Sequence, residues 1–133
     1  DGYFIDSGAR HFVYESETLE DDFVFKTGYK IRHHHLFSPY GINVNFYKVA
    51  DNRIVDIKTY EKGIENIVLS CASGSTAVVF HLSKNGRVDS PVLVRSAGGN
   101  LTFNFDQAWH DVWVEGPAKI LFTGDYKWEL ISK

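Results

Sequence analysis

The sequence predicts an all-β protein, an antiparallel β-sandwich or jelly-roll-like fold of about ten to twelve short strands. Three observations predict it. Apolar and polar residues alternate in several segments, turn residues recur between these segments, and aromatic residues make up 15% of the chain. Because successive side chains of a strand point to opposite faces of a sheet, each such segment is expected to have one buried and one wet face. One domain is expected to cover residues 1–133.

The first half of the chain contains strand candidates of unequal clarity. Residues 42–47 and 55–59 alternate cleanly, and Asp51-Asn52 between them is a turn signal. Less clearly patterned strands are expected at 11–14, 23–26 and 29–37. Residues 15–22 allow at most one short helical turn, because Ser16 or Thr18 is a suitable cap and acidic residues follow.

The second half is expected to be an antiparallel run. Asn85-Gly86 follows the alternating residues 76–82 and is typical of a type I′ hairpin turn. Further reversals are expected at Gly98-Gly99-Asn100, Gly116-Pro117 and Gly124-Asp125, the last before a terminal strand with Tyr126, Trp128 and Leu130 on one face.

Charge and composition exclude some classes of function. The chain has 14 basic and 17 acidic residues, a net charge of −3, and no cluster of basic residues among aromatic ones. A nucleic-acid partner is therefore not expected. No stretch is long and apolar enough to span a membrane, no signal peptide is visible, and no cofactor is implied. Because the chain begins at Asp1 and lacks Met, we expect a processed, trimmed or excised product.

Cys71 is the single cysteine, so no internal disulfide is expected. It alternates with Ile67 and Leu69, which predicts a small buried apolar residue. A reactive thiol would need an electropositive setting, and the neighbouring sequence supplies none. The segment Ser73-Gly74-Ser75 is interpreted as a turn before Thr76.

His33 and His35 are a candidate metal-binding pair. On a strand, residues two apart share a face, so both imidazoles would reach one ion. The pair resembles the first metal motif of cupins in spacing, but Gly28 lies one residue too close and no glutamate follows at the expected distance. A third ligand would have to come from a distant acid or from His11, His81 or His110. The alternative is a partly solvated strand whose histidines form hydrogen bonds or lie at an interface.

Residues 109–115 are a candidate binding face. Interpreted as a strand, this segment puts Val112 and Val114 toward the core. The opposite face would then carry two indoles and two carboxylates, from Trp109, Asp111, Trp113 and Glu115. Such a face suits a sugar, through stacking and hydrogen bonds to hydroxyls, or a protein partner. The alternative is that both Trp residues belong to the core.

The sequence contains no Gly-x-Ser-x-Gly elbow, no phosphate-binding Gly-rich loop and no His-Glu-x-x-His motif. These absences, with the aromatic content and acidic balance, favour a non-enzymatic structural or binding module. It would be a homo-oligomer or a surface-decorating subunit of a phage-like virion or cell-surface structure, in an extracellular, cell-surface or virion location rather than the cytoplasm. The alternatives are a carbohydrate-binding lectin that uses the Trp109–Glu115 face, and a metal-dependent enzyme at His33 and His35.

Overall fold

The computed structural model describes residues 2–126 and contains two α-helices among its strands. In chain order the elements are β1 (Gly2–Asp6), β2 (Arg10–Glu15), α1 (Asp21–Arg32), a 3₁₀ turn η1 (His35–Phe37), β3 (Asn43–Asp51), β4 (Ile54–Glu61), β5 (Asn66–Val68), α2 (Ala72–Lys84), β6 (Val92–Ser96), β7 (Gly99–Phe105) and β8 (Val112–Glu115). Neither helix in this part of the chain is long and apolar enough to cross a membrane.

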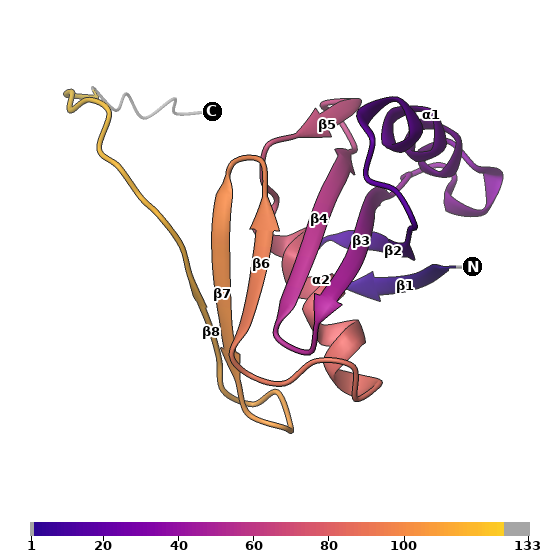
Figure 1. The fold of residues 1–133 in the computed structure, drawn as a ribbon. Coiled ribbons are helices and arrows are strands. Elements are labelled where there is room, and N and C mark those ends of the chain that lie inside the picture. Colours follow the sequence, from indigo (N-terminus) through magenta and orange to yellow (C-terminus); the bar gives the residue numbers. More distant parts are fainter. Residues whose placement is uncertain (1, 127–133) are drawn as a thin grey trace, which may run out of the picture.

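The strands form one mixed sheet of eight strands rather than two packed sheets. The order is β1-β2-β3-β4-β6-β7-β8, and β5 pairs with β4. The pairs β2–β3 and β4–β6 are parallel, and the remaining pairs are antiparallel. Parallel neighbours need a long crossover, and α1 and α2 lie in the two crossovers (Figure 1). Strands β1, β2, β3 and β7 all contact α2, so the sheet curls around this helix as a half-barrel.

The two helices cover opposite faces of the sheet. On β3, Val44 and Phe46 belong to the cluster that includes Val24 of α1, whereas Tyr47 belongs to the cluster formed with α2. All three side chains are at most 1% exposed. A strand covered on both faces buries consecutive residues, which is the pattern of a sheet with crossover helices. The all-β prediction is confirmed only in part, because the fold is mostly β but includes two helices, and the antiparallel sandwich or jelly roll is wrong.

The strand predicted at residues 76–82 is wrong, because these residues lie in α2. The β-branched residues Thr76, Val78 and Val79 favoured the strand prediction. However, the partly exposed positions of α2 recur every three to four residues, as on a helix: Ser73, Thr76, Phe80 and Ser83. Asn85-Gly86 ends this helix and makes no hairpin. Gly86 has φ +64° and donates its N–H to the Ser83 carbonyl, while the Arg87 N–H bonds to Leu82 O at 2.9 Å, which is a Schellman motif.

The predicted strands at 23–26 and 29–37 are also wrong, because α1 and η1 occupy these residues. Two acidic residues in the first turn of α1 and two basic residues in its last turn suit the helix dipole. The predicted strands at 11–14, 42–47 and 55–59 are confirmed, as is the reversal at 98–100. In the predicted terminal strand, Tyr126 is irregular, and Trp128 and Leu130 lie outside the described residues.

Gly28 lets α1 approach the sheet closely, and we expect Gly28→Ala to destabilise the fold. Alanine is better than glycine inside a helix by about 1 kcal/mol. However, a Cβ at position 28 would lie 2.6 Å from Cβ of Tyr60, a fully buried residue that has no room to move. Overpacking costs about 1–3 kcal/mol, so the net loss in the free energy of unfolding is expected to be about 1 kcal/mol, measured by urea denaturation. Lys30→Ala, at an exposed position of the same helix, is the control, and a Gly28→Ala protein as stable as this control would contradict the close packing.

Candidate active site

A pocket of about 540 Å³ lies where α2 begins. Segments far apart in the chain meet there: the turn between β1 and β2, the start of β3, the end of β4 and the first turn of α2. The lining residues are Asp6, Gly8, Ala9, Arg10, Tyr40, Asn43, Glu61, Lys62, Cys71 and Ser73. The Ser7 hydroxyl donates to the Ser73 carbonyl at 2.9 Å and so fastens the β1–β2 turn to the helix.

Cys71 is the N-cap residue of α2 and lies in this pocket. Its backbone is extended, with φ −142° and ψ 103°, and its carbonyl accepts the Ser75 N–H at 2.9 Å to close the first turn. The N–H groups of a first helical turn have no acceptor within the helix, and the helix dipole favours negative charge beside them. The site is therefore suited to a thiolate or to a bound carboxylate.

The structure corrects the interpretation of Cys71 as a buried apolar residue. The side chain is partly exposed and lines the pocket. The electropositive setting that the neighbouring sequence lacked is the start of a helix. The segment Ser73-Gly74-Ser75, interpreted as a turn, is the first turn of that helix. The run of small residues after Cys71 was the signal for a helix end that packs closely against its surroundings.

The rim of the pocket carries two side chains of each charge. Asp6 and Glu61 supply carboxylates, and Arg10 and Lys62 supply cations. The Arg10 guanidinium lies over the Tyr40 ring, 4.9 Å from its centroid. Asn43, which is 8% exposed, accepts the backbone N–H of Lys62 at 2.9 Å and fixes the end of β4 against the start of β3. The arrangement is suited to a small zwitterion with groups of both charges.

Polar side chains connect Cys71 to the protein interior, where His11 and Asn45 are fully buried. Nε2 of His11 is 3.1 Å from Oγ of Ser73, which is itself 3.5 Å from Sγ of Cys71. Asn45 contacts the other nitrogen of the imidazole at 2.9 Å. Burial is the main cause that lowers the pKa of His11, so the ring is neutral at pH 7. The sequence did not indicate this grouping, because its members come from β2, β3 and α2.

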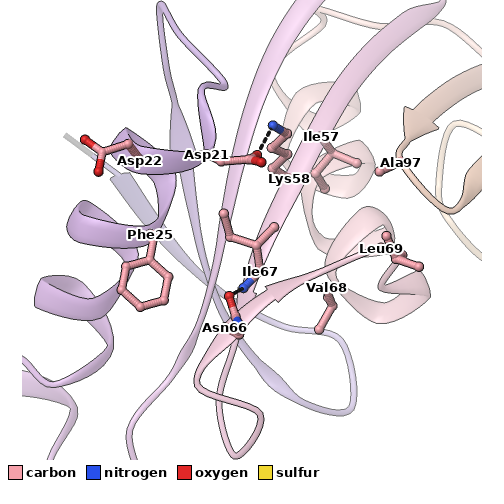
Figure 2. Close-up of a pocket in the computed structure, with 10 residues that line it drawn as sticks. All are labelled: Asp21, Asp22, Phe25, Ile57, Lys58, Asn66, Ile67, Val68, Leu69 and Ala97. Atoms are coloured by element: carbon pink, nitrogen blue, oxygen red, sulfur yellow. Dashed lines mark hydrogen bonds and ion pairs between the residues drawn. The ribbon is translucent and has the colours of Figure 1, made fainter.

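A second pocket, of about 520 Å³, lies between α1, β4 and β5 (Figure 2). Its walls are mostly apolar and include Phe25, Ile67 and Leu69. At its edge Lys58 forms an ion pair with Asp21. It contains no thiol or imidazole, so its lining offers fewer groups for proton transfer than the pocket at Cys71.

The histidine pair does not lie on a strand. His33 is the C-cap residue of α1, where its ring bonds to the Tyr29 carbonyl at 2.9 Å, and His35 lies in η1. Nε2 of His33 is 3.8 Å from a Glu65 oxygen. Within residues 2–126, no group of three or more His, Cys, Asp or Glu side chains is placed to hold a metal ion. The metal site stays a prediction for which the described residues supply no third ligand.

The predicted Trp109–Glu115 face is divided by a turn. Trp109 has φ +64° and precedes β8; its ring stacks on Phe105 at 4.9 Å and its Nε1–H donates to Ser83 Oγ at 2.8 Å. Trp113 is 65% exposed and donates to Asp111. Glu115 is exposed and accepts a bond from Asn104. Asp111, Trp113 and Glu115 are thus on the surface, while Trp109 packs between β7 and α2.

The comparison of folds identifies a class of protein. The chain is similar to a phenazine biosynthesis protein of the PhzF family from Bacillus anthracis, with a TM-score of 0.58 and 9% sequence identity, over 84% of this chain and 35% of that protein. At this identity the likeness shows the fold alone: a curled mixed sheet with a helix inside.

The sequence comparisons identify the family. The diaminopimelate epimerase family matches residues 3–121. The diaminopimelate epimerase of Aquifex aeolicus is 35% identical over 98% of this chain, and that of Chlorobaculum tepidum is 31% identical over 92%. The chain belongs to the diaminopimelate epimerase family. It spans about half the length of these relatives, since it covers 48% of each.

Family membership overturns the functional predictions made from the sequence. The relatives are named as an isomerase, so the prediction of a non-enzymatic structural or virion module is wrong. The lectin alternative is wrong for the same reason. The extracellular, cell-surface or virion location followed from the structural-module interpretation and is wrong with it. Catalytic sequence motifs are local patterns, whereas this pocket is assembled from segments that are distant in the sequence.

Proposed function

We propose that residues 1–133 contribute one side of the active site of an enzyme that inverts the configuration at an α-carbon of diaminopimelate. The observation that carries this proposal is the position of Cys71, a thiol at the first turn of α2 in a pocket with two cations and two carboxylates on its rim. The names of the related proteins support the substrate.

The charges of the pocket match those of the substrate. Diaminopimelate is a diamino dicarboxylic acid, which at neutral pH carries two ammonium and two carboxylate groups. Arg10 and Lys62 are suited to its carboxylates, and Asp6 and Glu61 to its ammonium groups. The first-turn N–H groups of α2 offer another position for a carboxylate.

Cys71 is proposed as the acid and base on one face of the α-carbon. Its thiolate removes the α-hydrogen as a proton: the C–H bond breaks, an S–H bond forms, and the electron pair delocalises into the adjacent carboxylate. The N–H groups at the start of α2 stabilise the negative charge that develops there. In the reverse direction the thiol returns the proton to the same face.

Inversion requires a second acid on the opposite face, because a proton returned by Cys71 restores the original configuration. Cys71 is the single cysteine of the chain, which spans about half the length of its relatives. We propose that a group outside residues 1–133 supplies this second acid. The surface supports a protein partner or a further part of the enzyme: Trp113, Ile120, Leu121 and Phe122 are at least 65% exposed, and residues 116–126 extend away from the sheet (Figure 1).

The test is to incubate the protein, at its natural length, with one stereoisomer of diaminopimelate in D₂O. Proton NMR and a chiral separation report deuterium at the α-carbon and the second stereoisomer. We expect both to accumulate, each inverted centre carrying deuterium from the solvent. Absence of exchange and of inversion with every stereoisomer would overturn the proposal.

Lys62 provides a prediction about substrate binding. In Lys62→Met the stem remains and the backbone N–H can still bond to Asn43, but one cation of the rim is lost. A hydrogen bond to a charged group contributes about 1.5–3 kcal/mol, so KM for diaminopimelate is expected to rise by about ten- to a hundredfold, with a smaller change in kcat. The control is Lys48→Met, at an exposed position on β3 outside the pocket. Equal KM values for the two variants in steady-state assays would contradict a role of Lys62 in binding.

A further inference from the structure

Four polar side chains form a continuous hydrogen-bonded chain that ends at the Cys71 sulfur. Thr59, Asn45 and His11 are at most 3% exposed. Oγ1 of Thr59 is 2.9 Å from Oδ1 of Asn45, and Nδ2 of Asn45 is 2.9 Å from Nδ1 of His11. Nε2 of His11 is 3.1 Å from Oγ of Ser73, which is 3.5 Å from Sγ of Cys71. The chain crosses from β4 through β3 and β2 to α2.

The direction of the hydrogen bonds follows from a backbone carbonyl, which can only accept. The carbonyl of Phe12 can only accept, and it lies 3.4 Å from Nδ2 of Asn45, so the amide nitrogen faces β2. The amide oxygen therefore faces Thr59, whose hydroxyl must donate to it. The second hydrogen of the amide nitrogen then points to Nδ1 of His11.

The tautomer of His11 follows from the orientation of Asn45. Because Nδ1 accepts from the Asn45 amide, the proton of the neutral ring lies on Nε2. Nε2–H therefore donates to Oγ of Ser73, which leaves the Ser73 hydroxyl hydrogen free to point at the Cys71 sulfur. The lowered pKa of His11, caused mainly by burial, agrees with a neutral ring.

We propose that Thr59, Asn45, His11 and Ser73 are positioning residues that direct a hydrogen bond at the Cys71 sulfur and so stabilise its thiolate. This inference rests on the proposed function in so far as Cys71 is the base that removes the α-hydrogen. None of the four needs to touch the reacting carbon. Their effect is to increase the fraction of Cys71 that is ready to accept a proton.

Gly74 supports the proposal because it makes room for this chain. A Cβ at position 74 would lie 2.1 Å from Oδ1 of Asn45 and 3.3 Å from Sγ of Cys71. Any other residue would push the Asn45 amide away from Thr59 or displace the start of α2. The glycine thus allows the amide and the thiol to lie on either side of the helix backbone.

The test measures the thiolate of Cys71 directly, by absorbance at 240 nm at pH 7. Each protein is compared with the same protein carrying Cys71→Ser, so that the difference reports this one sulfur. In Ser73→Ala the thiolate-to-thiol ratio is expected to fall about tenfold, the size expected for one hydrogen bond to a charged group. Ser73→Thr keeps the hydroxyl and is expected to restore the ratio. Thr76→Val removes a hydroxyl of the same helix that bonds to Ala72 O instead, and is expected to leave the ratio unchanged.

A second variant tests Thr59, at the end of the hydrogen-bonded chain farthest from Cys71. Thr59→Val has nearly the same shape but cannot donate to Asn45, which frees the amide to turn and the His11 tautomer to change. The thiolate-to-thiol ratio is expected to fall about threefold, part of the value of one hydrogen bond. Circular dichroism and Tm show that each variant is folded. An unchanged ratio in Ser73→Ala or in Thr59→Val overturns the proposal, as does an equal loss in Ser73→Ala and Thr76→Val.

The outcomes separate this inference from the proposed function. The absorbance difference requires no substrate and no turnover. If the enzyme epimerises diaminopimelate but its thiolate-to-thiol ratio does not depend on Ser73, only the positioning role of the four residues is overturned. If the thiolate-to-thiol ratio depends on Ser73 and Thr59 but the protein exchanges no α-hydrogen, the hydrogen-bonded chain is supported and the epimerase proposal is overturned.

Discussion

Cys71→Ser is expected to reduce kcat for the epimerisation of diaminopimelate by about 10³-fold. A serine hydroxyl does not ionise near neutral pH, so the proposed base is lost although the side chain keeps its shape. Binding should change little, because Arg10, Lys62, Asp6 and Glu61 remain on the rim. The measurement is the initial rate of inversion, with the rate of deuterium exchange at the α-carbon in D₂O as a second readout.

The matched control for Cys71→Ser is Thr76→Ala, which also changes one small polar group of α2. Its hydroxyl bonds to the Ala72 carbonyl and is absent from the pocket lining. We expect its kcat to stay within about twofold of the unmodified protein, because the first turn and the rim are unchanged. A Cys71→Ser enzyme that keeps more than about a tenth of the original kcat would exclude Cys71 as the base, since proton transfer by a positioned group contributes more than that.

Phe46→Ala is expected to lower the free energy of unfolding by about 3–5 kcal/mol. Phe46 is 0% exposed on β3 and packs edge-on against the rings of Tyr14 and Phe23, with centroids 5.4 Å and 6.0 Å away. Its removal leaves a cavity between the sheet and α1. Since a native domain is stable by only about 5–15 kcal/mol, this one change removes a large share of the total. Urea denaturation followed by tryptophan fluorescence measures it.

Phe4→Ala provides the comparison for Phe46→Ala, because Phe4 is 53% exposed on β1. The same atoms are removed there without opening a cavity, so the loss is expected to be below about 1 kcal/mol. Equal losses for the two variants, with equal m-values, would mean that Phe46 does not form the centre of the packing between the sheet and α1.

The strand predicted at residues 55–59 was right because alternate burial alone explains the order of apolar and polar residues there. Residues 55–59 alternate because β4 has one strongly buried face, and the turn predicted at Asp51-Asn52 lies one residue later, at Asn52-Arg53. Residues 76–82 also alternate approximately, but the partly exposed residues Thr76 and Phe80 lie four positions apart, as on a helix, and the adjacent residues Val78 and Val79 are both fully buried. Seven residues span only about two helical turns, too few for the apolar pattern to distinguish a helix from a strand, and the β-branched residues favoured the strand. The sandwich followed from this error, since without helices a second sheet was needed to cover the first.

The candidate site was missed because it is defined by tertiary contacts. Ser73 is a near neighbour of Cys71 in the sequence, whereas His11 and Asn45, which complete its polar surroundings, come from β2 and β3. Neighbouring residues of a chain are a poor guide to the electrostatics of a helix end that has not been predicted. Patterns of His and Trp stand out in a sequence, yet the structure places His33 and Trp113 away from the pocket.

The pocket is lined by segments that lie far apart in the sequence, so a ligand that binds there would connect them. Asp6 and Arg10 reach it from the β1–β2 turn, which the hydroxyl of Ser7 fastens to α2. A zwitterion that bridges these side chains to Lys62 and to the start of α2 would join the edge of the sheet to its centre. By mass action, such a ligand shifts the population from open forms of this turn to the closed one. The fraction of protein with bound zwitterion and the fraction with a closed β1–β2 turn would therefore be set by the same equilibrium.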